Sequence, residues 1–254
     1  MTRPDCTASA RGAPQDAPGA ATGAAITTVD LAAYYGQSRI LHGLSFELRR
    51  HEILVLLGRN GSGRTTTMRA IMGLVDRREG SVRIFGRETI SDPPFRIARL
   101  GLGYCPEERG IFASLSCEEN LALPPRLGDD RMSVEEVYEL FPNLAERRRT
   151  PGMRLSGGEQ QMLAIARILR SGARVLLLDE ISEGLAPAIV DRLFDTVERL
   201  RRLGYTIMMS EQNLEFAKSL ADRFLVVERG RIELALSAGE IDERSELIHR
   251  HLGV

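Results

Sequence analysis

The sequence predicts an α/β domain built around a mainly parallel sheet. Two apolar runs, at residues 53–57 and 175–178, have the length and the continuous apolar character of strands buried on both faces. A third core strand is expected at residues 205–209, and helical segments separate these runs along the chain. Strands that alternate with helices in this way are typical of α/β domains with a parallel sheet.

The chain before the first core strand divides into a tail and a β-rich stretch. Residues 1–25 are rich in Ala, Gly and Pro and have no periodic apolar face, so we expect a disordered tail followed by one domain at 26–254. Alternating apolar residues predict short strands at 26–31, 44–48 and 81–85. Between them, a helix is expected at residues 64–73.

The second half of the chain contains most of the predicted helices. Residues 117–123 and 134–140 have helical spacing and are separated by Pro and Gly, which predicts a small helical subdomain at about 113–158. Four further elements are expected after it: helices at 159–171 and 189–202, a strand pair at 224–227 and 232–234, and a last helix at 245–252.

Composition excludes several classes of protein. The 254 residues include 34 basic and 35 acidic side chains, and this balance does not indicate a nucleic-acid binder. The longest apolar runs are about five residues, whereas a membrane span needs roughly 20. We therefore expect that the chain does not cross a bilayer and that any role at a membrane depends on a partner. Three scattered cysteines indicate a reducing compartment rather than a disulfide framework.

A glycine-rich loop follows the first core strand. Residues 58–65, GRNGSGRT, match the phosphate-binding template G-x-x-x-x-G-K-[ST] except at the lysine. Glycines let successive backbone N–H groups point into one concavity, and the helix that follows adds its N-terminal dipole. We expect the hydroxyl of Thr65 to bind Mg²⁺ and Thr66 to reach an inner phosphate.

Arg64 occupies the lysine position of this template. Arginine keeps the positive charge and can bind phosphate bidentately, but its planar fork is longer than an ammonium group. Two explanations stay open. The substitution lowers activity, or it reflects a chain that uses arginine almost everywhere, since Lys218 is its only lysine.

Two carboxylates follow the second core strand. Because ligands of open α/β sheets bind at the carboxyl ends of the strands, Asp179 and Glu180 are expected beside the phosphate loop. Asp179 would hold Mg²⁺ through water, and Glu180 would orient or deprotonate the attacking water. Beside a phosphate loop, an apolar run that ends in these two carboxylates resembles a Walker B strand.

A second phosphate site is predicted at residues 155–161, LSGGEQQ. Ser156 is a natural N-cap, and Glu159 completes a capping box three residues later. The backbone N–H groups of Gly157 and Gly158 would face an anion. One chain has no second nucleotide for this site, so we expect two domains to face head to tail, each closing its signature over the other's ATP.

These motifs together resemble the ATP-binding subunits of ABC transporters, over residues 26–254. The resemblance implies a P-loop NTPase core with an N-terminal antiparallel β subdomain and a small α-helical subdomain. It also implies that Tyr35 stacks on adenine, that Glu107 occupies the Q-loop position, that residues 183–186 form the D-loop, and that Gln212 stands where a switch histidine is usual.

Three segments are similar to the ATPases of branched-chain amino acid importers: residues 106–112, 182–187 and 210–213. Importers of urea and short amides are close relatives of that subgroup. The resemblance implies ATP and Mg²⁺ as cofactors, a second ABC ATPase subunit, transmembrane permease subunits and, indirectly, a periplasmic binding protein. It also implies a location in the cytoplasm, on the inner face of the bacterial cell membrane.

Motifs and resemblance together predict three groups of site residues. The catalytic group is Arg64, Glu180 and Gln212, and the metal ligands are Thr65, Glu107 and Asp179. The nucleotide-binding group is Tyr35, Gly58, Arg59, Asn60, Gly61, Ser62, Gly63, Arg64, Thr65, Thr66, Ser156, Gly157, Gly158 and Glu159.

Two other functions stay open at this stage. Arg64, Gln212 and Ile181, which replaces the proline common after the Walker B glutamate, favour a regulatory subunit that binds ATP and hydrolyses little of it. The second alternative is a soluble ABC protein of translation or DNA repair. Such proteins usually carry two ATPase domains or long helical insertions, and this sequence has neither.

Overall fold

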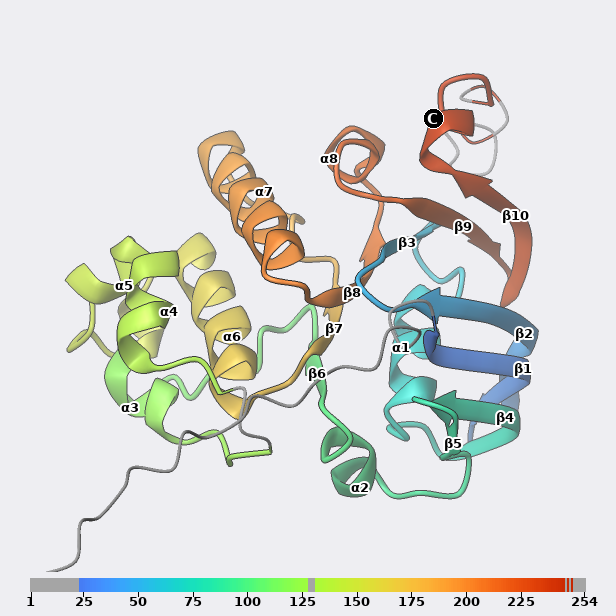
Figure 1. Cartoon of the computed structure of the whole chain (residues 1–254), viewed down its shortest axis with the longest axis horizontal. Coiled ribbons are helices and arrows are strands. Elements are labelled where there is room, and N and C mark those ends of the chain that lie inside the picture. Colours follow the sequence, from blue (N-terminus) through green and yellow to red (C-terminus); the bar gives the residue numbers. More distant parts are fainter. Residues whose placement is uncertain (1–22, 128–130, 245, 247, 249–254) are drawn as a thin grey trace, which may run out of the picture.

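The computed structural model describes residues 23–127, 131–244, 246 and 248. Residues 1–22 of the tail predicted at 1–25 lie outside these residues, as does most of the helix expected at 245–252. Two sheets and the helices packed on them account for the fold (Figure 1). None of the helices in the described part of the chain combines the length and apolarity needed to cross a bilayer.

A six-stranded sheet forms the centre of the molecule, in the order β10-β9-β3-β8-β7-β6. All pairs from β9 to β6 are parallel, and only β10 is antiparallel to its neighbour, so the prediction of a mainly parallel sheet is confirmed. Every residue of β3 and β7 is buried, which explains their continuous apolar sequences. The strands are β3 (Ile53–Leu57), β6 (Leu102–Cys105), β7 (Val175–Asp179), β8 (Thr206–Glu211), β9 (Arg223–Glu228) and β10 (Arg231–Ser237).

A second, antiparallel sheet contains the N-terminal strands in the order β2-β1-β4-β5. β1 (Ala24–Tyr35) and β2 (Ser38–Arg49) have 12 residues each, much longer than predicted, and the other strands are β4 (Arg77–Ile84) and β5 (Arg87–Glu88). Register shifts within the β1–β2 pair interrupt the two-residue alternation on which the prediction relied. β1 also starts before the expected end of the tail, and its Ala25 is fully buried.

Helix α1 (Arg64–Ile71) lies between the two sheets. Met68 and Ile71 pack there in one apolar cluster with Leu54 and Leu56 of β3 and with side chains of β1 and β2. The helix is thereby fixed against both sheets, and its first residues form the end of the phosphate loop. This position decides where the side chain of Arg64 begins.

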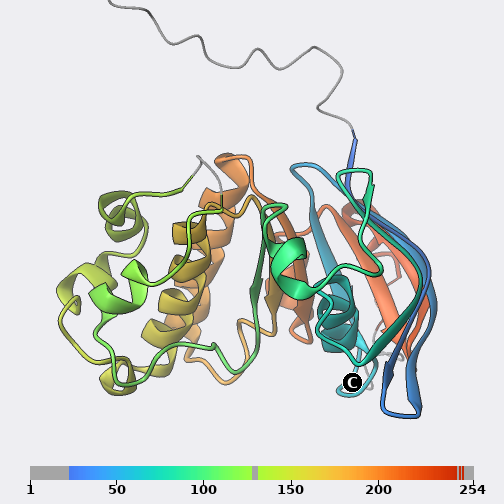
Figure 2. The same ribbon diagram turned by 90° about the horizontal axis from the view of Figure 1, so that it is seen from below.

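The opposite face of the central sheet is covered by α6 (Gly157–Ser171), α7 (Pro187–Arg202) and α8 (Leu214–Lys218), as Figure 2 shows for α6 and α7. A small helical region adjoins α6 through α3 (Cys117–Ala122) and α4 (Val134–Leu140), where helices were predicted, and through α5 (Pro142–Glu146). Short elements that the sequence did not predict are α2 (Pro94–Ala98), α5, α8, β6, and the 3₁₀ turns Gly152–Arg154 and Ala238–Glu240. Pro142 occupies the first turn of α5, where proline is tolerated.

Candidate functional site

The phosphate loop connects β3 to α1 and lines a cavity of about 270 Å³. Gly61 and Gly63 have φ angles of 77° and 111°, in the left-handed region that glycine adopts without strain. A Cβ atom on Gly58 would lie 2.3 Å from the carbonyl oxygen of Val227, so the loop passes too close to β9 for a side chain. The cavity is lined by Tyr35, Ile40, Gly61, Ser62, Gly63, Arg64, Thr65, Thr66 and Glu180.

Arg64 lines this cavity, and its side chain is only 3% exposed. Its Nη2 donates a 2.7 Å hydrogen bond to Oε1 of Glu180, which makes a buried ion pair across the cavity. A longer contact of 3.4 Å joins the same nitrogen to Oδ1 of Asn60. Burial lowers the pKa of Arg64, and the charge of Glu180 opposes that shift. The arginine that stands at the template's lysine position therefore pairs with Glu180, the residue predicted to activate water.

Asp179 and Thr65 meet where the sequence predicted a metal ion. The Thr65 hydroxyl donates to Oδ1 of Asp179 at 3.1 Å, and Asp179 is fully buried at the end of β7. Tyr104 donates to the other carboxylate oxygen at 2.9 Å, and the Ser210 hydroxyl donates to Oδ1. Neither Tyr104 nor Ser210 was predicted, because their role depends on β6 and β8 lying on either side of β7.

Gln212 and Asn60 complete a ring of hydrogen bonds around Glu180. Nε2 of Gln212 donates to Oδ1 of Asn60 at 2.6 Å and to Oε2 of Glu180 at 3.2 Å. Glu180 has a φ angle of 49°, and its amide donates to the Ser210 carbonyl at 3.1 Å. Sequence reasoning identified Gln212 and Glu180, and the structure brings both to the loop from β8 and β7.

Glu107 lies with two other carboxylates. Oxygen atoms of Glu107, Glu180 and Glu183 are all within 4.8 Å of one another. A hydrogen bond with Glu180 raises the pKa of Glu183 to about 7, and burial together with the charge of Glu180 raises the pKa of Glu107. Adjacent carboxylates, a threonine hydroxyl and a buried aspartate are the hard oxygen ligands that Mg²⁺ prefers, so the residues present fit this ion.

A further acid, Glu211, was not predicted. Its side chain is 2% exposed and accepts a 2.6 Å hydrogen bond from the Ser182 hydroxyl, which joins β8 to the segment after Glu180. Burial raises the pKa of Glu211 to about 7. Its position directly before Gln212 was the one sequence signal that it belongs to the site. That signal does not reveal that the Glu211 side chain is buried.

The predicted signature forms the start of α6. Ser156 and Glu159 make a reciprocal capping box, with Ser156 N donating to Oε2 at 2.8 Å and Glu159 N donating to Oγ at 3.3 Å. A Cβ atom on Gly158 would lie 2.4 Å from Cγ2 of Ile189 in α7. Figures 1 and 2 place α6 and α1 on opposite sides of the central sheet, and among the described residues no signature side chain lines the phosphate-loop cavity.

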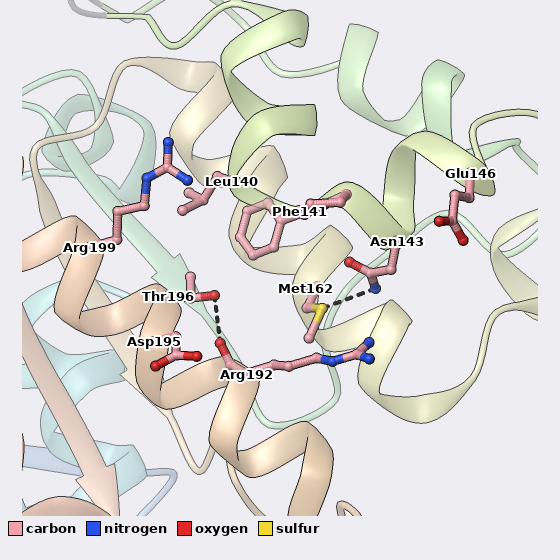
Figure 3. Close-up of a pocket in the computed structure, with 10 residues that line it drawn as sticks. Leu140, Phe141, Asn143, Glu146, Met162, Arg192, Asp195, Thr196 and Arg199 are labelled. Atoms are coloured by element: carbon pink, nitrogen blue, oxygen red, sulfur yellow. Dashed lines mark hydrogen bonds between the residues drawn. The ribbon is translucent and has the colours of Figure 1, made fainter.

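Two grooves border the helical region. One, of about 550 Å³, runs beside Pro106 and Arg109 and is bounded by the half-exposed apolar side chains of Phe112 and Leu123. The other, of about 440 Å³, lies between α4, α5, α6 and α7 and was not predicted. Figure 3 shows this second groove, where Asn143 contacts the sulfur of Met162 at 3.1 Å.

Comparison with known proteins identifies the family. The model of the ABC transporter family matches residues 41–183, a segment that contains the phosphate loop, the signature and the acidic strand end. The chain is a member of the ABC transporter family. Its sequence and its motifs are those of an ATP-binding subunit.

The relatives of this ABC subunit also indicate its subgroup. It is 43% identical over 202 residues to the high-affinity branched-chain amino acid transport ATP-binding protein BraG of Pseudomonas aeruginosa, covering 78% of this chain and 87% of the relative. It is 33% identical to the probable branched-chain amino acid transport ATP-binding protein LivF of Archaeoglobus fulgidus, covering 90% and 99%. The predicted resemblance is thus confirmed.

A solved structure confirms the fold. The ATP-binding subunit of an ABC transporter superposes on this chain with a TM-score of 0.75 at 24% identity, covering 90% of this chain and 99% of that one. The P-loop core, the antiparallel β sheet and the helical region predicted from the sequence are therefore those of an ABC ATPase.

Proposed function

We propose that this ABC subunit binds and hydrolyses ATP to power uptake of branched-chain amino acids or related small amides. The observation that supports this most is that Arg64, Thr65 and Glu180 line the phosphate-loop cavity. Asp179 hydrogen-bonds to Thr65, and Gln212 hydrogen-bonds to Glu180. The names of BraG and LivF support the substrate class.

Nucleotide binding would use the described cavity. The phosphates would lie on the backbone amides of residues 58–66, and adenine would stack on Tyr35, which is 36% exposed at the end of β1. Thr65 and Asp179 would hold Mg²⁺, with Glu107 beside them. When bound, the ion neutralises phosphate charge that develops during transfer.

The hydrolytic step would depend on residues that surround the terminal phosphate. The Glu180 carboxylate would accept a hydrogen bond from the attacking water and so orient it, and it can take up the proton of that water. Gln212 can orient the same water or a phosphate oxygen through its amide, but it cannot accept a proton as histidine does. Tyr104 and Ser210 keep Asp179 in place through the two hydrogen bonds described above.

The proposed function requires a second ATPase subunit and permease subunits. The signature at Ser156, Gly157, Gly158 and Glu159 would contact the ATP of a second ABC ATPase subunit, since it lies apart from the cavity of its own chain. The groove beside Pro106, with its exposed Phe112 and Leu123, would receive a transmembrane permease subunit. Such an assembly would hold the chain at the inner face of the bacterial cell membrane and would receive substrate from a periplasmic binding protein.

The second candidate is a regulatory subunit that binds ATP and hydrolyses little. The ion pair of Arg64 with Glu180 favours it, because a base that is held by a guanidinium does not face water. The two candidates make the same prediction for ATP binding and opposite predictions for turnover.

Calorimetry with Mg-ATP, followed by turnover measurements in an assembly with permease and partner ATPase, tests the proposal. We expect the native chain to bind and hydrolyse ATP, and Glu180→Gln to bind ATP without hydrolysing it. Absence of ATP binding by the folded chain would overturn the proposal. Binding with turnover no higher than that of Glu180→Gln would favour the regulatory subunit.

A further inference from the structure

The ion pair between Arg64 and Glu180 connects two parts of the site that ATP must separate. Arg64 belongs to the loop proposed to receive phosphate, and Glu180 is the proposed base. Their side chains are 3% and 8% exposed, so water screens the contact little. Both line the same cavity of about 270 Å³, and a triphosphate placed there would lie between them.

Both oxygens of the Glu180 carboxylate already accept hydrogen bonds. Oε1 accepts from Arg64 at 2.7 Å and Oε2 accepts from Gln212 at 3.2 Å. Asn60 holds the two donors together, because its Oδ1 accepts from Gln212 at 2.6 Å and contacts Nη2 of Arg64 at 3.4 Å. In this arrangement the carboxylate is directed at the loop, and its oxygens are engaged by side chains instead of by water.

The second terminal nitrogen of Arg64 is available as a hydrogen-bond donor. This nitrogen, Nη1, is buried and has no hydrogen-bond partner among the described residues. A buried donor without a partner costs free energy, and a phosphate with several anionic oxygens can satisfy both Nη atoms at once. A lysine ammonium is a single point and has no second nitrogen with which to bridge two groups. The arginine therefore gives phosphate a means of competing with Glu180.

We propose that Arg64 is a latch that holds Glu180 in the nucleotide-free chain and releases it when a terminal phosphate binds. The inference rests on the proposed function and adds regulation to the same site. The amides of the loop would hold the inner phosphates. The terminal phosphate would lie toward Glu180, to which Gln212 donates while also donating to Asn60. A diphosphate does not extend to Glu180, so it leaves the latch closed.

The test compares a triphosphate analogue with a diphosphate on the full chain. Binding of Mg-AMP-PNP and of Mg-ADP is measured by calorimetry, at concentrations where light scattering shows a monomer. Glu180→Gln weakens the hold on Arg64 without changing the shape of the side chain. We expect AMP-PNP binding to tighten about tenfold or more, because a hydrogen bond to a charged group no longer has to be broken. ADP binding should change less than about twofold.

Glu183→Gln is the matched control. It removes a carboxylate that lies within 4.8 Å of Glu180, so it changes the charge of the cluster but leaves the ion pair with Arg64. We expect it to shift AMP-PNP and ADP binding by the same factor. In Arg64→Lys, which cannot bridge the two groups, Glu180→Gln should tighten AMP-PNP binding less than about threefold.

The outcomes separate the latch from the proposed function. If neither nucleotide binds to the folded chain, the proposed function fails. If both nucleotides bind and Glu180→Gln changes the two affinities by the same factor, the latch is overturned and the proposed function stands. The same conclusion follows if Glu180→Gln tightens AMP-PNP binding as much in the Arg64→Lys chain as in the native chain. If Glu180→Gln does not fold, Arg64→Lys alone decides. Because lysine leaves no latch to break, this variant should raise the ratio of AMP-PNP affinity to ADP affinity, and an unchanged ratio contradicts the latch.

Discussion

At the scale of single residues, Arg64 is where this chain departs most from the phosphate-loop template. Its guanidinium donates to the Glu180 carboxylate at 2.7 Å, so this contact takes part in setting its position. A cation placed slightly off the developing charge loses transition-state stabilisation and keeps ground-state binding. The residue thus bears more on turnover than on affinity.

We therefore expect Arg64→Lys to raise kcat in the assembled transporter by a larger factor than it changes ATP affinity. A difference of about 2–3 kcal/mol in the barrier corresponds to roughly a 30- to 150-fold increase. Steady-state kinetics with the permease and partner ATPase present would check this. An equal kcat in both proteins would show that arginine is a tolerated substitution.

Tyr35 supplies the stacking surface for the base in our account. It is 36% exposed and lines the same cavity as the phosphate loop. Tyr35→Ala should weaken Mg-ATP binding by about 1–3 kcal/mol, the size of one base–aromatic stack, whereas Tyr35→Phe keeps the ring and should bind normally. Calorimetry on both variants decides, and equal loss in the two would exclude stacking.

Glu211 gives the site a dependence of stability on pH. The folded chain keeps this proton to a pKa of about 7, while the unfolded chain loses it near 4.5. The folded state thus binds more protons between these values, and rising pH lowers the free energy of unfolding. Above about pH 7 the loss is complete.

Glu211→Gln removes this titration and keeps an oxygen to accept from Ser182. As the pH rises from 4.5 to 7, we expect the free energy of unfolding of the variant to gain on the order of 3 kcal/mol relative to that of the native chain. Urea unfolding at several pH values measures the difference. Glu183 has a raised pKa in both proteins, so its contribution cancels, and a difference that does not change with pH would contradict the assignment.

The site residues that the sequence predicted are those that motifs fix by local spacing. Thr65 follows the loop, Asp179 ends an apolar strand, and both positions can be seen without knowing the fold. Tyr104 and Ser210 could not be predicted, because they reach Asp179 only through the strand order β8-β7-β6. Which side chains meet across a parallel sheet depends on that order.

At the scale of elements, the two signature glycines of α6 have different surroundings. A Cβ atom on Gly158 would lie 2.4 Å from Cγ2 of Ile189, in the contact between α6 and α7. On Gly157 the nearest atom would be Nη2 of Arg109 at 3.3 Å, the end of a flexible side chain. Gly158 is thus required by packing, independently of any phosphate.

Gly158→Ala should lower the free energy of unfolding by about 1–3 kcal/mol, as overpacking commonly does. Gly157→Ala is the control on the same helix turn and should stay within about 0.5 kcal/mol of the native chain. Urea unfolding in the absence of nucleotide measures both. If the two variants lose the same stability, the contact with Ile189 does not explain the glycine.

The bounds of the two longest helices were predicted most accurately. α6 and α7 were predicted within about two residues of their observed ends, because their apolar stripes continue over four turns and α6 has a capping box. α2, α5 and α8 have five residues each, too few for a periodic signal. β1 and β2 were predicted too short because register shifts break their alternation.

At the scale of the whole molecule, the central sheet lies between the two segments proposed to bind phosphate. The loop at α1 carries the cavity, and the signature at the start of α6 lies on the other side of β3, β7 and β8. The sequence predicted a head-to-tail pair of domains because one chain offers no second nucleotide to its signature, and the observed separation is consistent with that prediction. Both sites are used at once only if two chains meet head to tail.

The mass of the chain in solution tests this arrangement most directly. With Mg-ATP, Glu180→Gln should keep the nucleotide and form a dimer, so light scattering should show the mass doubling, alone or with the partner ATPase. Without nucleotide the mass should be that of a monomer. A mass that stays monomeric with saturating ATP, even with the partner ATPase present, would contradict the account.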